Sequence, residues 1–354
     1  MSYGDTTETI IVEASNQESP PTEKLSEIAA LTEEVKQLRQ SVENLGQQSP
    51  DLDNLKIEFQ EVGKQLQSQI FSLAQPPVKV GVYVDLSNIS LNGGFGMKFD
   101  VLREFACRGN GYPTRLNVYL AFDDERAKND PDYQISALDF HSLLRDQGYK
   151  VIEKKLRWFT DEKGVKVSKA NSDLDLAADA LTQSDGLDRV VLVSGDGDFV
   201  QVIRTLQNKG CRVETVSFKN VSQDLRKETD QFFSGYLIPN LLPTSGNGEW
   251  GNPGSRVRGV CYNFSKDRGF GFLRYLKKIN APLWITDTRH PDSPYGTAFV
   301  HESQVKDIKD QGIKPSDLPN RDIIFEFDLV EDEKGMQAKA LQVTHAYPSY
   351  RSRF

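Results

Sequence analysis

Acidic residues follow two of the most apolar stretches of this 354-residue sequence and recur in a third segment between them. Asp85 comes near the end of the stretch VKVGVYVDL, and Asn88 follows it three residues later. Asp196 and Asp198 come directly after RVVLVS, where the flanking glycines allow the chain to turn sharply. The segment between them, NSDLDLAADAL, contains Asp173, Asp175 and Asp179.

Several carboxylates brought together would form a site for a divalent cation. One like-charge pair at about 4 Å costs about 4 kcal/mol at an effective dielectric constant near 20, and a cation removes that cost. Oxygen ligands without a nearby His or Cys indicate Mg²⁺ or Mn²⁺ rather than zinc. The alternative is that these residues cap helices. It stays open for Asp175 and Asp179, and it is weaker for acids at strand ends.

Residues 78–238 have the pattern of an α/β domain that could position these acids. Strands are predicted at 78–86, 117–122, 151–155, 189–194 and 212–217. Helices are predicted at 97–107, 133–147, 174–181, 199–209 and 222–232. Continuously apolar strands separated by helices predict a mostly parallel sheet with both faces covered. Ligands bind at the carboxyl ends of the strands in such sheets, where these acids would meet.

The N-terminal region has a different texture. Residues 1–22 lack apolar periodicity, which predicts a disordered N-terminus. From Ile28 to Leu45 apolar residues recur at steps of three and four, and a weaker seam follows, so residues 23–75 are predicted to be a coiled coil or helical region. Because an isolated helix of this length is marginal, we expect a homo-oligomer, usually a dimer, through residues 23–73. A helical hairpin within one chain is the alternative.

The C-terminal region reads as a separate small domain. Residues 239–255 are rich in Gly, Pro, Ser and Asn, which predicts a flexible linker. Residues 256–345 contain short strand-like runs joined by turns, which predicts a small all-β barrel, and residues 346–354 form a tail. The loop 276–296 is long for such a domain, and the sequence gives it no role.

Composition excludes several classes of protein. No run of about 18 apolar residues is present, so no membrane span is expected, and the polar N-terminus does not resemble a secretory signal. The three cysteines are far apart in the sequence and are predicted to be reduced thiols of a cytoplasmic protein. A net charge of −8 argues against a general polyanion binder, although local basic patches remain possible sites.

The acid-bearing motifs carry a family resemblance. GVYVDLSN at 81–88, SDLDLAADAL at 172–181 and VLVSGDGDF at 191–199 resemble the LabA-like NYN family, relatives of PIN-domain nucleases. The resemblance covers residues 78–238 and implies a metal-dependent endoribonuclease that uses Mg²⁺ or Mn²⁺. The catalytic and metal-binding acids that it implies are Asp85, Asp173, Asp196 and Asp198, with Asp179 as a second helix acid. The polar supports of that catalytic site would be Asn88 and Ser194.

A basic segment follows the third predicted strand. The stretch KKLRWF at 154–159 mixes cations with aromatic residues, and Lys163, Lys166 and Lys169 follow it. Phosphates pair with cations and bases stack on rings, so Lys155, Arg157 and Lys169 are candidates for RNA binding. A solvated hairpin anchored by Trp158 is the alternative.

The predicted barrel carries aromatic residues in strand alternation. Period two places Phe270 and Phe272 on one face of a strand. It likewise places Phe299 and His301 on one face of a second strand. RGFGF at 268–272 and FVH at 299–301 resemble the two ribonucleoprotein motifs of a cold-shock domain, an OB-type barrel that binds single-stranded nucleic acid. The RNA-binding candidates are Lys266, Arg268, Phe270, Phe272, Phe299 and His301. Asn263 and Glu302 replace two aromatic residues of the family pattern, so the platform is reduced.

These features favour an RNA-directed bacterial protein with an acidic nuclease site, an RNA-binding barrel and an assembly helix. Its partner would be single-stranded or structured RNA. The alternative is a non-catalytic RNA-binding regulator that acts through oligomerisation or a recruited partner. An aspartyl phosphatase fits less well, because such enzymes need a second acid two residues after the first, and position 87 is Ser.

Overall fold

The computed structural model describes most of the chain after residue 75. The described residues are Glu33, Lys36, Gln37, Gln40, Gly63, 76–160, 166–169, 172–246, 248–280, 282–306, 308 and 312–348. The predicted disordered segment 1–22, nearly all of the predicted coiled coil 23–75 and most of the tail 346–354 lie outside them. The chain divides into two compact units, Met1–Pro76 and Pro77–Phe354, and the second is described below. None of the described helices has the length and apolar character needed to cross a membrane.

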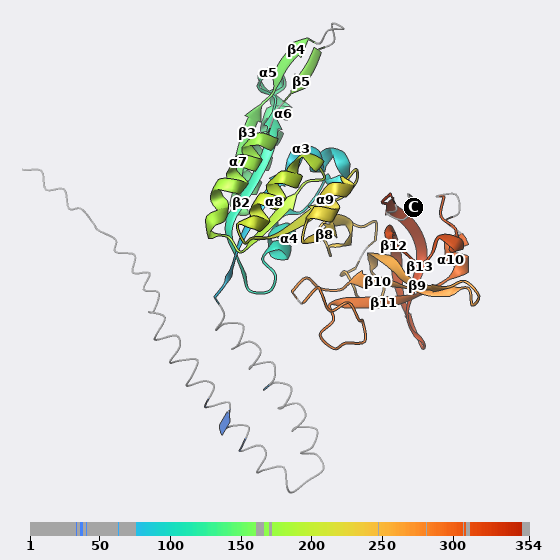
Figure 1. Cartoon of the computed structure of the whole chain (residues 1–354). Helices are drawn as coiled ribbons and strands as arrows, with labels where there is room; N and C mark the ends of the chain where they lie inside the picture. The colour runs from blue at the N-terminus through green and yellow to red at the C-terminus, as the bar shows by residue number, and fades with distance from the viewer. Residues whose placement is uncertain are drawn as a thin grey trace, which may run out of the picture. The chain divides into compact units, whose positions relative to one another are not determined.

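A six-stranded parallel sheet forms the centre of the α/β part, as predicted (Figure 1). Its strand order is β3-β2-β1-β6-β7-β8, and every neighbouring pair is parallel. The strands are β1 (Val78–Asp85), β2 (Gly111–Phe122), β3 (Lys150–Lys155), β6 (Arg189–Val193), β7 (Arg212–Ser217) and β8 (Gln231–Ser234). The order of the strands reverses between β1 and β6, so the switch point of the sheet lies between the ends of these two strands.

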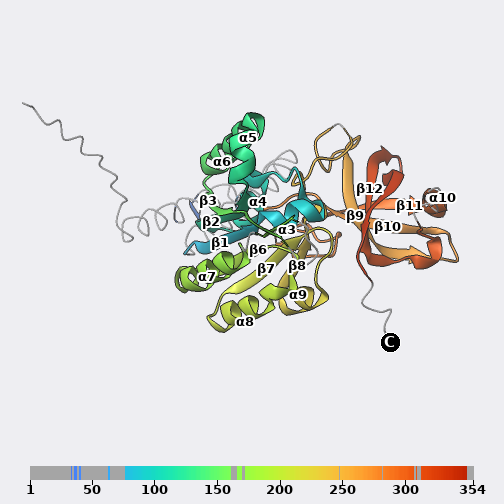
Figure 2. The ribbon, with the colours of Figure 1, turned by 90° about the horizontal axis from the view of Figure 1, so that it is seen from above.

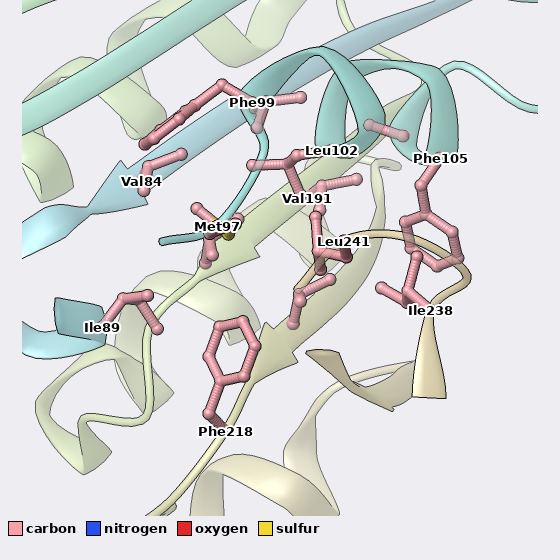
Figure 3. Packing of buried hydrophobic residues seen from close by; sticks show 14 of the residues in the cluster. Val84, Ile89, Met97, Phe99, Leu102, Phe105, Val191, Phe218, Ile238 and Leu241 are labelled. Carbon is pink, nitrogen blue, oxygen red and sulfur yellow. The ribbon is translucent and has the colours of Figure 1, made fainter. Parts of the chain in front are cut away.

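Helices cover both faces of the sheet (Figure 2). The helices are α3 (Leu86–Ile89), α4 (Phe99–Ala106), α5 (Asp124–Asn129), α6 (Pro131–Asp146), α7 (Asp173–Gln183), α8 (Val200–Asn208) and α9 (Gln223–Glu228). Short helical turns occur at η1 (Ser90–Gly94), η2 (Ser184–Gly186), η3 (Gly197–Phe199) and η4 (Gly235–Leu237). One face packs Val84 and Val191 against Phe99, Leu102 and Phe105 of α4 (Figure 3). The other face packs against α7, α8 and α9.

The predicted helix 222–232 is wrong in its second half. Helix α9 ends at Glu228, and the chain then enters β8 beside β7. Thr229 and Asp230 cause this change, because the Thr229 hydroxyl donates to the carbonyl of Val213 and the Asp230 carboxylate accepts its N–H. The following Phe232 and Phe233 are typical strand residues.

A two-stranded antiparallel hairpin follows β3. Its strands are β4 (Arg157–Thr160) and β5 (Lys166–Lys169). Figure 1 shows that the hairpin projects beyond the end of β3, on the side of the sheet where the parallel strands have their carboxyl ends. The basic segment identified in the sequence therefore extends outward from the edge that carries the acids.

The C-terminal part is a closed five-stranded barrel and fits the predicted small OB-like barrel. Its strands pair in the order β10-β11-β13-β12-β9. Their bounds are β9 (Arg256–Ser265), β10 (Phe270–Leu276), β11 (Tyr295–His301), β12 (Asn320–Asp332) and β13 (Gly335–Ala346). The short helices α10 (Glu302–Lys306) and η6 (Pro315–Asp317) lie between β11 and β12. Residues that include Phe325, Phe327 and Leu273 fill the barrel interior.

The segment 239–255 packs against the folded parts on both sides, although its composition predicts a flexible linker. Leu241, Leu242 and Trp250 are buried. The Trp250 indole Nε1 donates to the carbonyl of Leu276 at 2.7 Å, which fixes the segment to the barrel. The three apolar side chains explain the difference, because burying them compensates for ordering a stretch rich in Gly and Pro.

Side-chain contacts also join the barrel to the α/β part. The Arg226 guanidinium on α9 lies 3.1 Å from the Asp322 carboxylate and stacks between Phe232 and Tyr347. The Tyr347 hydroxyl also bonds to the Ser234 hydroxyl at 2.9 Å. The α/β part and the barrel are therefore in direct contact.

Candidate active site and nucleic-acid interface

Asp85 ends β1 at the switch point of the sheet and is only 2% exposed. Its Oδ1 accepts the N–H of Asn88 at 3.1 Å, and its Oδ2 accepts the hydroxyl of Ser194 at 3.1 Å. Burial raises the pKa of the Asp85 carboxyl to about 6, and the nearby charges of Asp173 and Asp196 act in the same direction. The two hydrogen bonds lower this pKa but do not cancel the effect of burial.

The turn after β6 is tied to the end of β1. The Asn88 side-chain oxygen accepts the N–H of Gly195 at 3.0 Å, and the Ser194 hydroxyl accepts the N–H of Asp196 at 3.2 Å. Gly195 has no room for a side chain, because an added Cβ would lie 2.9 Å from the Ser217 hydroxyl. Asn88 and Ser194, expected to be polar supports, thus join the two strand ends that carry Asp85 and Asp196.

The three acids of α7 have different surroundings. Asp173 begins the helix, is half-buried, and is close enough to raise the pKa of Asp85. Asp175 forms an ion pair with Lys154 at 2.6 Å. Asp179 lies about 9 Å farther along the helix axis than Asp173, and its carboxylate accepts the Tyr119 hydroxyl at 2.8 Å. Asp173 is therefore the helix acid that the structure brings to Asp85.

Asp198 lies at the outer side of this cluster. Its side chain is exposed, and its N–H donates to the Asp196 carboxylate at 3.0 Å. Within the described part of the chain, no three His, Cys, Asp or Glu side chains are grouped tightly enough to enclose a metal ion. The carboxylates of Asp85, Asp173 and Asp196 offer only oxygen atoms, which is the type of ligand that Mg²⁺ and Mn²⁺ prefer.

Exposed apolar side chains near the acids were not identified from the sequence. Leu91 and Phe95 follow Asn88 closely and are 86% and 85% exposed, and Leu174 follows Asp173 and is 67% exposed. The loop with Leu91 and Phe95 is held in place, because the Asn92 amide donates to the carbonyl of Asn88. The sequence places a large apolar residue beside two of the three acidic motifs, but a single apolar residue has no periodicity that would show whether it is exposed.

The basic candidates after β3 are only partly described. Lys155 is exposed and forms an ion pair with Asp124 at 2.6 Å. Arg157 and Lys169 are paired directly across the hairpin β4–β5, and their side chains lie outside the described part of the structure.

The barrel gathers three phenylalanine rings on its outer face. Phe272 pairs with Phe299 across β10 and β11, and Phe270 pairs with His301. The ring centres of Phe270, Phe272 and Phe299 lie 5.5–6.3 Å apart, and all three side chains are partly exposed. A hollow of about 430 Å³ opens beside Phe272 and Phe299 and is also lined by Met336. We call these three rings the phenylalanine cluster.

Cations accompany this cluster at both ends. Lys266 and Arg268 are exposed in the turn between β9 and β10. Toward the other end of β10, the Arg274 guanidinium lies 5.7 Å from the ring centre of Tyr262 and 5.0 Å from that of Tyr295. The sequence did not single out these last three residues, because a register shift between β9 and β10 determines where Tyr262 meets Arg274.

Residues 79–240 match the family model described as the NYN domain, and they contain every acid of the candidate site. The α/β part is a LabA-like NYN domain. Over 167 residues the chain is 28% identical to the low amplitude and bright protein LabA of Synechococcus elongatus. The matched region covers 45% of this chain and 85% of that protein.

A solved structure of a protein of unknown function from Vibrio parahaemolyticus RIMD 2210633 is 22% identical to this chain. It covers 45% of this chain and 93% of its own, with a TM-score of 0.36, which is too low for a comparison of the two folds.

Proposed function

We propose that this chain is a metal-dependent endoribonuclease whose NYN domain hydrolyses RNA and whose barrel binds single-stranded RNA. The environment of Asp85 is the observation that carries the proposal. A buried carboxylate at the switch point of a parallel sheet, with two further acids close to it, is expensive for the fold. Such strongly perturbed groups concentrate at functional sites.

The residues that would hold Mg²⁺ or Mn²⁺ are Asp85, Asp173 and Asp196, with Asp198 at the exposed side and Asp179 farther along α7. Mg²⁺ is commonly bound through one or two carboxylates, while waters and substrate phosphates complete its shell. When bound, the cation supplies polarisation of the scissile phosphate and an activated water.

The remaining side chains position the acids and the RNA. Ser194 and Asn88 hold the ends of β1 and β6 together, which keeps Asp85 and Asp196 at one edge. Leu91 and Leu174 offer apolar contact for bases next to the scissile phosphate. The phenylalanine cluster would hold a more distant part of the same strand by stacking, at about 1–3 kcal/mol per base.

Cleavage of labelled single-stranded RNA by the purified full chain with Mg²⁺ or Mn²⁺ tests the proposal. We expect cuts that EDTA abolishes and that Asp196→Asn reduces by about 100-fold or more. Asp185→Asn is the matched control, because Asp185 is an exposed acid just beyond the opposite end of α7 and is paired with Lys209. Equal cutting by wild type and Asp196→Asn would contradict the proposal.

A non-catalytic RNA-binding regulator is the second candidate. The open arrangement of the acids, without a tight three-ligand group in the described residues, favours it. Wild-type protein that binds RNA but leaves it uncut with both metals would support this function. Dimerisation through residues 23–73 and a cytoplasmic location also remain predictions, and sedimentation of the full chain tests the first.

A further inference from the structure

Several contacts anchor the described residues of the long loop between β10 and β11. Ile279 and Leu283 are buried anchors. The carbonyl of Leu283 accepts the Tyr295 hydroxyl at 3.0 Å, and the Ser293 hydroxyl donates to the carbonyl of Ile285 at 2.8 Å. These contacts fix the part of the loop that contains the next exposed aromatic residue.

The side chain of Trp284 projects from this loop into solvent. It follows the buried Leu283 directly, yet its own side chain is 80% exposed. The N–H of Thr286 donates to the carbonyl of Trp284 at 3.0 Å, so a tight turn presents the indole. Because exposing so large an apolar side chain is unfavourable, a ligand that covers the Trp284 ring would gain free energy.

The loop is joined to the face that carries the phenylalanine cluster. The Arg274 guanidinium on β10 donates to the carbonyl of Thr286 at 3.2 Å. On β11 the Thr297 hydroxyl bonds to the Thr288 hydroxyl at 2.8 Å, and Thr297 also lines the hollow beside Phe272 and Phe299. The aromatic face therefore continues through Arg274 and Thr297 into the loop.

The charges at this end favour a polyanion. Lys277 and Lys278 are exposed at the start of the loop, and neither forms an ion pair within the described residues. Arg274 lies between two aromatic rings at the junction of loop and strand. Rings alternating with cations along one surface match the alternation of bases and phosphates in single-stranded RNA.

We propose that the loop extends the RNA-binding face of the barrel and that Trp284 stacks on a base of single-stranded RNA beyond the bases held by the phenylalanine cluster. The inference rests on the proposed RNA binding by the barrel. Trp284 would supply an additional aromatic ring to the barrel, in which Asn263 replaces an aromatic residue of the cold-shock pattern.

Binding of oligouridylates of 4 and 10 nucleotides tests the proposal, by fluorescence anisotropy with full-length Asp196→Asn protein to prevent cleavage. We expect Trp284→Ala to weaken binding of the 10-mer by roughly 10-fold and that of the 4-mer by less than about 2-fold. Trp284→Phe should retain most of the affinity, because it keeps a ring. Asp292→Ala, an exposed change in the same loop, should bind both oligomers like the parent.

Phe272→Ala separates failure of this inference from failure of the proposed function. If Phe272→Ala weakens both oligomers while Trp284→Ala binds both like the parent, the role of Trp284 is wrong and the RNA-binding barrel stands. If the parent binds neither oligomer, both ideas are overturned. Quenching of tryptophan emission by the 10-mer gives a direct readout, because the quenching should be smaller in Trp284→Phe.

Discussion

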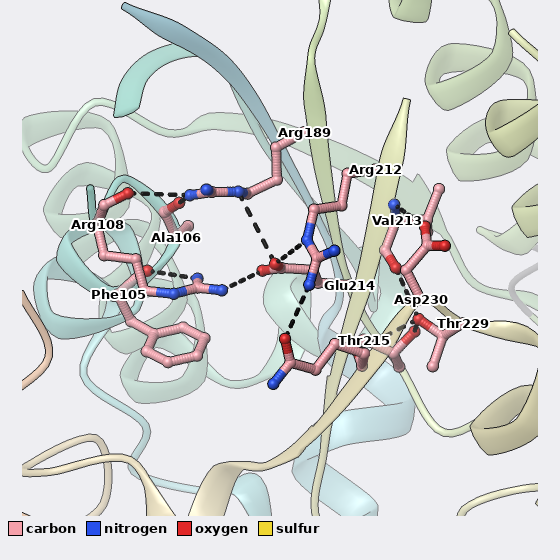
Figure 4. A network of polar contacts seen from close by, with 11 residues as sticks. Phe105, Ala106, Arg108, Arg189, Arg212, Val213, Glu214, Thr215, Thr229 and Asp230 are labelled. Carbon is pink, nitrogen blue, oxygen red and sulfur yellow. Dashed lines mark hydrogen bonds and ion pairs between the residues drawn. The ribbon is translucent and has the colours of Figure 1, made fainter. Parts of the chain in front are cut away.

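Two buried carboxylates of the NYN domain sit in opposite electrostatic surroundings. Glu214 on β7 is surrounded by guanidinium groups: Arg108 lies 2.6 Å away, Arg212 2.9 Å and Arg189 3.9 Å (Figure 4). Asp85 on β1 is equally buried, but it is bonded to a hydroxyl and a backbone N–H and forms no ion pair within the described residues.

The pKa values of the two groups diverge accordingly. Burial acts to raise both, but at Glu214 the three arginines outweigh it and the pKa falls below its usual value. At Asp85 burial prevails and two further acids add to it, so the pKa rises to about 6. The Glu214 carboxylate is neutralised within the fold, whereas the counter-charge for Asp85 would come from the proposed cation.

The largest expected effect comes from removing the neutralised carboxylate. Glu214→Ala leaves three arginines around a buried site without a counter-charge, so we expect a loss of about 3–5 kcal/mol in the free energy of unfolding. Urea denaturation measures it. Glu228→Ala is the control, because Glu228 pairs with Arg204 near the surface and its loss should destabilise the fold far less than the loss of Glu214. Equal losses in the two variants would contradict a structural role for the arginine cluster.

Replacing Asp85 is expected to have the opposite effect, an increase in the free energy of unfolding. Between pH 3.8 and about 6 the folded protein keeps a proton that the unfolded chain loses, so its free energy of unfolding falls as pH rises. Asp85→Asn lacks this fall. The variant should therefore match wild type near pH 3.5 and exceed its stability by up to about 3 kcal/mol at pH 8. Urea denaturation across this pH range decides, and a variant less stable than wild type at pH 8 would contradict the comparison.

A divalent cation should supply the missing counter-charge. At ten times its dissociation constant it stabilises the folded state by about 1.4 kcal/mol. We expect Mg²⁺ to raise the melting temperature of wild type at pH 7.5, to do so much less at pH 5, where Asp85 is mostly protonated, and to leave Asp85→Asn unchanged. NaCl of equal ionic strength is the control. An equal increase in the melting temperature of Asp85→Asn would mean that Mg²⁺ binds at another site.

The sequence predicts those features of the fold and of the acidic site that depend on local sequence pattern. Apolar strands ending in acids predict the parallel sheet and the positions of Asp85 and Asp196, because strand ends and turns are local features. The Gly and Pro content of 239–255 predicts a flexible linker, but it takes no account of Leu241 and Trp250, which are buried in the structure.

Partners distant in the sequence could not be predicted. The question left open for the helix acids depends on Lys154, which pairs with Asp175, and on Tyr119, which donates to Asp179. These partners lie 21 and 60 residues away from the acids of α7, on strands β3 and β2. At Glu214 only Arg212 is a local partner, two residues earlier in the sequence, whereas Arg108 lies 106 residues away and could not be predicted.

The smallest expected effect comes from Ser194→Ala, which changes the pKa of Asp85 and leaves its carboxylate in place. Ser194→Ala removes the hydroxyl that donates to Asp85, a bond that lowers its pKa. A lost hydrogen bond of about 1 kcal/mol corresponds to somewhat less than one pH unit, so the pH-dependent fall in stability should extend upward by about that much. Ser217→Ala is the matched control, because Ser217 is a buried serine at the end of the neighbouring strand β7 whose hydroxyl has no hydrogen-bond partner among the described residues. An unchanged pH dependence in Ser194→Ala would show that the Ser194 hydrogen bond does not lower the pKa of Asp85.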